Sequence, residues 1–267
     1  MTDDELLAKV ESYSYYHIIN VTDTISTPGK PAHVPAQKVF MKYLDAINLE
    51  EKRVLDVGCR DGLFSFAAEQ RGAAEVIGID NDLSRAAVEF LIPHFRSRVQ
   101  MVEKNVYDLS PEEMGVFDVI LFPGVLYHLR YPFWSIKVLR ELLKPGGDLL
   151  IDTMIWDGKN RDAMLYCPID TQHDATTCTL FNRKGLVDTL WSLGFELRSL
   201  EYADMDEGKG LARKTKNLIK QALKHVPLVE SKAVARGTFH FSYTKSSLDD
   251  SFVSKYWEQT HNFHSKI

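Results

Sequence analysis

The stretch Arg53–Asp82, RVLDVGCRDGLFSFAAEQRGAAEVIGIDND, decides the fold. Its apolar residues Val54, Leu55 and Val57 are typical of a strand buried on both faces. A glycine turn from Gly58 to Gly62 follows, and an apolar helical stripe then runs to a stop at Gly72. The next apolar run ends at Asp80, about twenty residues beyond the glycine turn. This spacing predicts a strand–helix–strand unit of a mostly parallel α/β sheet.

The composition of the glycine turn selects among nucleoside ligands. Dinucleotide sites use G-x-G-x-x-G, so that a helix N-terminus meets a pyrophosphate. Here Arg60 takes the place of the middle glycine, and Asp61 would repel a diphosphate. S-adenosylmethionine (SAM) has no phosphate, and its amino acid end suits a turn that begins with Asp56 and Gly58. Asp80 can then accept hydrogen bonds from the ribose hydroxyls.

These motifs resemble those of class I SAM-dependent methyltransferases. V-L-D-V-G-C-x-x-G at 54–62 resembles their first motif, and D-N-D at 80–82 resembles their second. The resemblance implies a Rossmann-like, seven-stranded, mostly parallel sheet whose last strand inserts antiparallel beside the sixth. It implies cofactor contacts from Asp56, Gly58, Gly62, Asp80, Asn81 and Asp82. The alternative is a Rossmann-like domain whose glycines serve packing alone.

The composition limits the partners and the cellular setting. The chain has 267 residues, a net charge of −5 and a pI near 6.0, so its overall field does not attract nucleic acid. The three cysteines lack the spacing of a metal site, and we expect no metal and a reducing, cytoplasmic location. We expect no signal peptide and no membrane span, because no apolar run is long enough.

The remaining pattern extends this unit into further elements. We expect helices at 2–16, 36–47, 83–95, 132–143 and 183–193. We expect further strands at 99–106, 117–122, 148–155, 195–202 and 238–245. The chain then divides into a helical lid at 1–48, a SAM-binding core at 49–203, a basic helical insertion at 204–235, the last core strand at 236–245 and a tail at 246–267.

Polar residues follow the third and fourth strands, at the edge where α/β sheets bind ligands. Asn105 can accept a hydrogen bond from the adenine amino group, and the N–H of Val106 can donate to a ring nitrogen; a plain polar loop is the alternative. After the fourth strand, Tyr127 and His128 are expected near the reacting methyl group. His128 is the candidate base because histidine titrates near neutrality. Packing against the next helix is the alternative for His128.

The string G-V-L-Y-H at 124–128, with L-D-V-G-C at 55–59 and K-P-G-G at 144–147, is similar to the tRNA wobble-uridine methyltransferase family. In that family's best-known member, a carboxymethyl group passes from carboxy-SAM to 5-hydroxyuridine in tRNA. The family's carboxylate clamp implies Lys9 and Arg236 as partners of Tyr127, and His33 stands where the family has a tryptophan. The resemblance also implies cofactor contacts from Lys38, Asn105, Val106, Pro123 and Tyr127.

Four other segments are candidates for contact with a substrate or partner. The aromatic cluster at 13–17 is expected to form a lid over the cofactor or a seam that holds the first helix. The basic insertion is a solvated helix or a contact for tRNA phosphates or another anionic substrate. Aromatic residues in the tail suggest docking onto another subunit, as in a homo-oligomer. The segment 156–181 lacks periodicity and is expected to line the acceptor site, whose polar candidates are Asp152, Asp157, Tyr166 and His173.

Three functions remain open from the sequence. The first is SAM-dependent methyl transfer to a small-molecule, sugar-containing or glycan-type acceptor, which the acidic net charge favours. The second is methyl or carboxymethyl transfer to the wobble uridine of tRNA, with carboxy-SAM as the alternative cofactor. The third is a non-catalytic, SAM-binding partner subunit. We expect ordinary SAM, because Arg60 and His33 depart from the family pattern.

Overall fold

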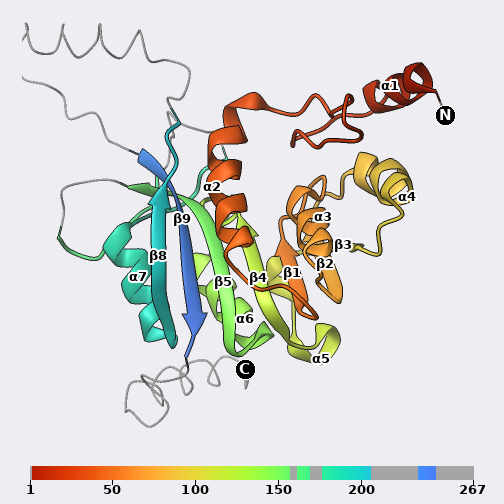
Figure 1. The fold of residues 1–267 in the computed structure, drawn as a ribbon. Coiled ribbons are helices and arrows are strands. Elements are labelled where there is room, and N and C mark those ends of the chain that lie inside the picture. Colours follow the sequence, from red (N-terminus) through yellow and green to blue (C-terminus); the bar gives the residue numbers. More distant parts are fainter. Residues whose placement is uncertain (1, 157–160, 169–175, 206–233, 245–267) are drawn as a thin grey trace, which may run out of the picture.

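The computed structural model describes residues 2–156, 161–168, 176–205 and 234–244. One mixed sheet runs through these residues, with helices on both of its faces (Figure 1). The predicted α/β, Rossmann-like class is therefore confirmed. The strands are β1 (Arg53–Val57), β2 (Glu75–Asp80), β3 (Gln100–Glu103), β4 (Phe117–Pro123), β5 (Leu143–Trp156), β6 (Leu165–Tyr166), β7 (Leu180–Asn182), β8 (Phe195–Tyr202) and β9 (Val234–Tyr243).

The strand order creates an edge at which a ligand can bind. The order β3-β2-β1-β4-β5 is parallel throughout, and β9 lies between β5 and β8, antiparallel to both. This matches the seven-stranded arrangement implied by the resemblance, to which β6 and β7 add a short hairpin. From β1 the chain passes outward to β2 and β3 and then returns to β4 on the other side. Such a reversal opens a crevice at the carboxyl ends of β1 and β4.

Helices cover both faces because successive residues of the central strands point to opposite sides. In β1, Val54 packs into one core and Leu55 into the other, which explains why apolar residues stand on both faces of the strand. Helices α2, α3 and α4 contribute to the core that contains Val54, whereas α6 and α7 contribute to the core that contains Leu55. The helices are α1 (Asp3–Glu11), α2 (Val34–Asp45), α3 (Leu63–Gln70), α4 (Ile92–Phe95), α5 (Pro111–Met114), α6 (Pro132–Leu142) and α7 (Arg183–Ser192).

Several predicted boundaries were wrong. Helix α1 ends at Glu11 rather than at 16, and β3 spans only Gln100–Glu103 because Asn105 already caps a 3₁₀ turn. The helix expected at 83–95 contains a π-helical segment, Ala87–Leu91, before the turn that holds Pro93. The segment 156–181 was expected to be irregular, but β6 and β7 form there, because strands of two or three residues show no periodicity.

The basic insertion lies almost entirely outside the described residues, and the tail, Asp157 and His173 lie wholly outside them. In the described part of the chain, no helix has the length and apolar character needed to cross a bilayer.

Candidate functional site

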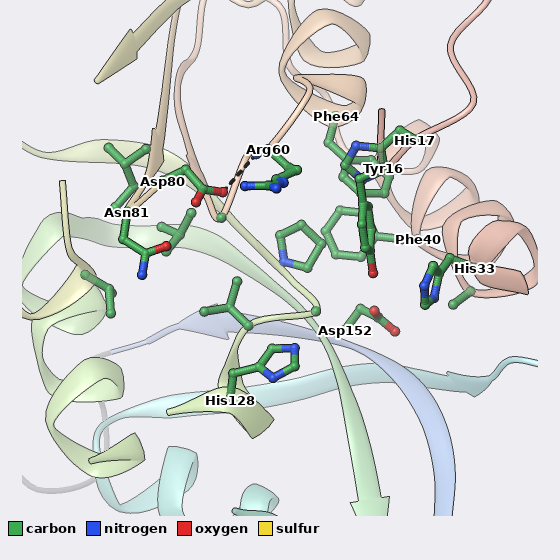
Figure 2. Close-up of a pocket in the computed structure, with 18 of the residues that line it drawn as sticks. Tyr16, His17, His33, Phe40, Arg60, Phe64, Asp80, Asn81, His128 and Asp152 are labelled. Atoms are coloured by element: carbon green, nitrogen blue, oxygen red, sulfur yellow. Dashed lines mark hydrogen bonds between the residues drawn. The ribbon is translucent and has the colours of Figure 1, made fainter. Parts of the chain in front are cut away.

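A cavity of about 570 Å³ opens at the carboxyl ends of β1, β2, β4 and β5. Figure 2 shows many of the side chains that line it. The cavity has two opposite ends. The β2–β3 end is formed by Asp80, Asn81, Asn105 and Val106. The β5–β9 end is formed by Tyr16, Lys30, His33, Asp152 and Arg236.

The glycine turn forms the wall between these ends. The backbone N–H groups of Gly58 and Cys59 both donate to the carbonyl of Ile79, which fixes the turn to β2. Gly58 has φ +80°, and a Cβ there would overlap the side chain of Val125. Position 58 therefore requires glycine both for its backbone conformation and for the close approach of the loop after β4.

Asp80 holds the turn as well as facing the cavity. Its Oδ2 accepts from the Arg60 N–H at 3.0 Å, and its Oδ1 accepts from the Asp82 N–H at 3.1 Å. A carboxylate offers about four acceptor positions, so Asp80 keeps capacity for the hydroxyls of a ligand. The guanidinium of Arg60 donates to the Asp82 carboxylate at 2.6 Å. Asp82 is thus engaged by Arg60 and does not line the cavity, whereas Asn81 does.

Asp61 anchors the N-terminal segment. Its buried carboxylate accepts from the backbone N–H groups of Tyr16 and His17. Burial alone would raise the pKa of Asp61, but the hydrogen bonds from His17 and Ser84 outweigh burial and lower it. Asp61, which would repel a diphosphate, thus fixes the aromatic cluster at 13–17 beside the cavity. Tyr16 and His17 of this cluster form part of the cavity wall.

Two residues of the loop after β3 face the cavity. Asn105 and Val106 line the β2–β3 end. Asn105 Oδ1 accepts from the Tyr107 N–H at 3.1 Å and so caps the 3₁₀ turn Val106–Asp108. The side-chain amide of Asn105 is therefore held in a defined orientation beside the backbone of Val106.

Of the two predicted catalytic residues in the loop after β4, His128 lines the cavity and Tyr127 does not. Pro123 and Gly124 also line the cavity. His128 Nδ1 is bonded to the carbonyl and hydroxyl oxygens of Thr176, at 3.1 and 2.9 Å. Tyr127 is buried and does not line the cavity; its hydroxyl oxygen accepts from Arg236 Nη1 at 3.1 Å. Tyr127 thus acts on the cavity through Arg236.

A buried ion pair forms the floor of the β5–β9 end. Asp152 Oδ2 accepts from Nε and Nη2 of Arg236 at 2.9 and 2.6 Å. Burial lowers the pKa of Arg236, but the charges of Asp152 and Tyr127 outweigh burial and raise it, so the guanidinium stays charged. Gly124 makes room for the pair, since a Cβ there would lie 2.8 Å from Arg236 Nη2.

Two residues of the β5–β9 end, Lys30 and His33, were not predicted as site residues. The sequence showed that His33 stands where the resembling family has a tryptophan. The His33 ring stacks on Tyr16, with centroids 4.8 Å apart, and Lys30 Nζ lies 5.0 Å from the centroid of the same ring. Burial, followed by the charges of Arg236 and Lys30, lowers the pKa of His33, while Asp152 opposes this. These effects together favour the neutral form of the His33 imidazole. The sequence signals for His33 are its place in a loop just before a helix and its register with the family's tryptophan.

Some predicted cofactor contacts do not line the cavity. Lys38 is exposed on α2, and the neighbouring Gln37 faces the cavity instead. Asp56 is fully buried beneath the turn, where its Oδ2 accepts from Ser65 on α3 at 2.6 Å. Gly62 begins α3 with φ +85° and lies against Met101. Asp56 and Gly62 support the turn from below.

The family of the chain follows from a comparison with family models. Residues 33–200, more than half of the chain, match a model described as a methyltransferase domain. The chain belongs to the methyltransferase domain family. The matched region contains β1 to β7 and the cavity residues contributed by their loops. The family expected from the glycine turn and from D-N-D is thereby confirmed.

Related proteins extend the comparison. The tRNA U34 carboxymethyltransferase of Helicobacter acinonychis (strain Sheeba) is 37% identical over 130 residues, which cover 48% of this chain and 49% of that protein. The chain thus spans about half the length of the curated relatives it matches. A crystal structure of the N-terminal domain of EvdMO1, in the presence of SAH and D-fucose, superposes with a TM-score of 0.62. It has 15% sequence identity and covers 91% of this chain and 98% of that one, which establishes the fold.

Proposed function

We propose that this methyltransferase-family chain binds SAM in the cavity and transfers its methyl group to an acceptor at the β5–β9 end. The observation that carries this proposal is the convergence of Gly58, Asp80, Asn105 and Val106, from three separate loops, on one cavity. Asp80 has acceptor capacity for ribose hydroxyls, and Asn105 with the Val106 backbone suits the edge of an adenine. No phosphate-binding glycine pattern competes with this arrangement.

The size and shape of the cavity suit a direct methyl transfer. A volume of about 570 Å³ falls within the range of about 300–1,000 Å³ found for small-molecule sites. With adenosine at the β2–β3 end, the methionine portion extends past Gly58 toward His128 and Asp152. Methyl transfer needs the nucleophile, the methyl carbon and the sulfur in line, and the walls at Pro123 and Gly124 would hold this alignment.

The pairing of Arg236 with Asp152 favours ordinary SAM over carboxy-SAM. The guanidinium of Arg236, which the resemblance implied as part of a carboxylate clamp, is already paired with Asp152. Lys9, the other implied partner, lies 5.1 Å from the ring centroid of Tyr13 and does not line the cavity. A cofactor carboxylate would therefore meet an arginine whose charge Asp152 already compensates.

The preferred acceptor is a small or sugar-containing molecule. Tyr16, Lys30 and His33 from the N-terminal segment wall off the end where the acceptor would enter, which suits a compact substrate. The acidic net charge points the same way. The wobble uridine of tRNA is the second candidate, favoured by the tRNA U34 carboxymethyltransferases among the relatives.

The test of the proposal combines binding and turnover. Calorimetry should show SAM binding to the purified chain and no binding of NAD, whereas the reverse result would reject the cofactor assignment. Incubation with methyl-labelled SAM should then label a member of a small-molecule panel but not unmodified tRNA. Salt-dependent filter binding of tRNA together with label transfer would replace the preferred acceptor by the second candidate. SAM binding without label transfer to either class would favour a non-catalytic partner subunit.

A further inference from the structure

The ion pair at the β5–β9 end is unusually asymmetric. In the antiparallel pairing of β5 and β9, Arg236 lies opposite Met154, two residues along β5 from Asp152. Two nitrogens of Arg236 donate to a single oxygen, Asp152 Oδ2, and the third donates to Tyr127. Each of the three Arg236 nitrogens thus donates one hydrogen bond, and none of these bonds goes to the second carboxylate oxygen, Asp152 Oδ1.

That second oxygen, Asp152 Oδ1, has no hydrogen-bond partner among the described residues, although it is buried. Asp152 as a whole is only 3% exposed, yet it lines the cavity (Figure 2). A buried carboxylate oxygen without a donor or a cation costs free energy, and a ligand that supplies positive charge recovers that cost. The environment of Asp152 therefore indicates that the ligand carries a cationic group.

The other charged residues at the β5–β9 end are cations, so binding of a positively charged ligand there depends on Asp152. Lys30 and Arg236 are cations that line the β5–β9 end, and the imidazoles of His17 and His33 stand beside them. Asp152 is the sole carboxylate at this end among the described lining residues. Asp80, the other lining carboxylate, belongs to the β2–β3 end. Without Asp152, a positively charged ligand would meet uncompensated buried positive charge.

We propose that Asp152 makes the cavity selective for the sulfonium form of the cofactor over its neutral sulfide product. The carboxylate of Asp152 carries one negative charge, which is paired with the guanidinium of Arg236 and, from the cavity wall, also attracts the sulfonium of SAM. S-adenosylhomocysteine (SAH), which has lost the positive charge with the methyl group, gains nothing from that charge. The same residue thus favours capture of the substrate and release of the product. This inference rests on SAM binding as proposed above.

The test measures the ratio of SAM affinity to SAH affinity by calorimetry. Asp152→Asn keeps a hydrogen-bond acceptor for Arg236 but removes the negative charge, so the ratio should fall by about tenfold. Arg236→Gln leaves Asp152 unneutralised, so the ratio should rise by a similar factor. The double variant should stay below the wild-type ratio, because it lacks the carboxylate that attracts the sulfonium, but above the ratio of Asp152→Asn, because it also lacks the guanidinium that repels the sulfonium.

A matched control comes from the same pair of strands. Asp148 on β5 bonds His240 on β9 at 2.8 Å and does not line the cavity, so Asp148→Asn should leave the ratio unchanged. An unchanged ratio in whichever folded single variant is measured would overturn the inference, as would a double variant whose ratio equals that of the wild type. Failure of the wild-type chain to bind either ligand would instead reject the proposed function itself.

Discussion

Replacing Asp56 by asparagine tests the physical state of the carboxylate beneath the glycine turn. Asp56 is fully buried, and its Oδ1 has no partner among the described residues. Burial raises the pKa of Asp56 from 3.8 to about 7, and the charge of Asp80 adds to this, while the Ser65 hydrogen bond opposes it. The folded chain therefore binds a proton at Asp56 that the unfolded chain has lost above pH 4.

The direction of the pH effect follows from this difference. Because the pKa is raised in the folded state, stability is highest below the unfolded pKa and declines as the pH rises toward about 7. The interval between 3.8 and about 7 corresponds to a loss of up to about 4 kcal/mol. Asp56→Asn cannot ionise and still offers Ser65 an acceptor, so the variant should escape the loss.

Urea unfolding at pH 5, 6, 7 and 8, followed by circular dichroism, measures the effect. The free energy of unfolding of Asp56→Asn, minus that of the wild type, should grow from pH 5 to about pH 7 and then level off, because Asp56 is ionised in both the folded and the unfolded chain above that pH. Asp118→Asn is a control: the hydrogen bonds of Arg53 and Lys144 outweigh burial and lower the pKa of Asp118, so it stays ionised throughout this range. Its difference from the wild type should be constant. A constant difference for Asp56→Asn would show that Asp56 is ionised in the folded chain and would refute the reasoning.

Three further substitutions test the cavity. Gly58→Ala places a Cβ against Val125 at φ +80°, so it should cost about 1–2 kcal/mol in thermal unfolding and weaken SAM binding; an unaltered melting temperature would contradict the assigned turn. Asp80→Ala removes the acceptor for the ribose and for the turn, so calorimetric SAM affinity should fall about a hundredfold or more; near-normal affinity would exclude Asp80 from the site. Tyr127→Phe frees Arg236 from one hydrogen bond, so kcat should fall more than SAM affinity does; equal losses would indicate a role in binding alone.

The centre of the fold could be predicted because its signals are local. The run at 54–57, the glycines at 58 and 62 and Asp80 lie within one short stretch, and each constrains the backbone of its neighbours. The strand order came from the resemblance to methyltransferases, since periodicity does not specify which strands pair. Asp56 shows where local signals fail: in β1 it shares the face of Val54 and points toward α3, away from the cavity.

The arrangement of the β5–β9 end could not be predicted from local sequence signals, because its contacts join residues far apart in the chain. Arg236 and Asp152 are 84 residues apart and meet only through the pairing of β9 with β5. Lys30 and His33 belong to a segment whose Thr, Pro and Gly content predicts a loop and nothing more. Their approach to the cavity depends on the bond between Asp61 and the backbone of Tyr16. No pattern within the sequence indicates such a bond.

The most direct test of SAM binding in this cavity is a crystal structure of the chain soaked with SAH. The proposed function predicts electron density for adenosine between Asp80 and Val106, with the homocysteine sulfur directed toward the β5–β9 end, near Asp152. A cavity left empty at saturating SAH, or an adenosine placed at the β5–β9 end, would contradict the proposed site.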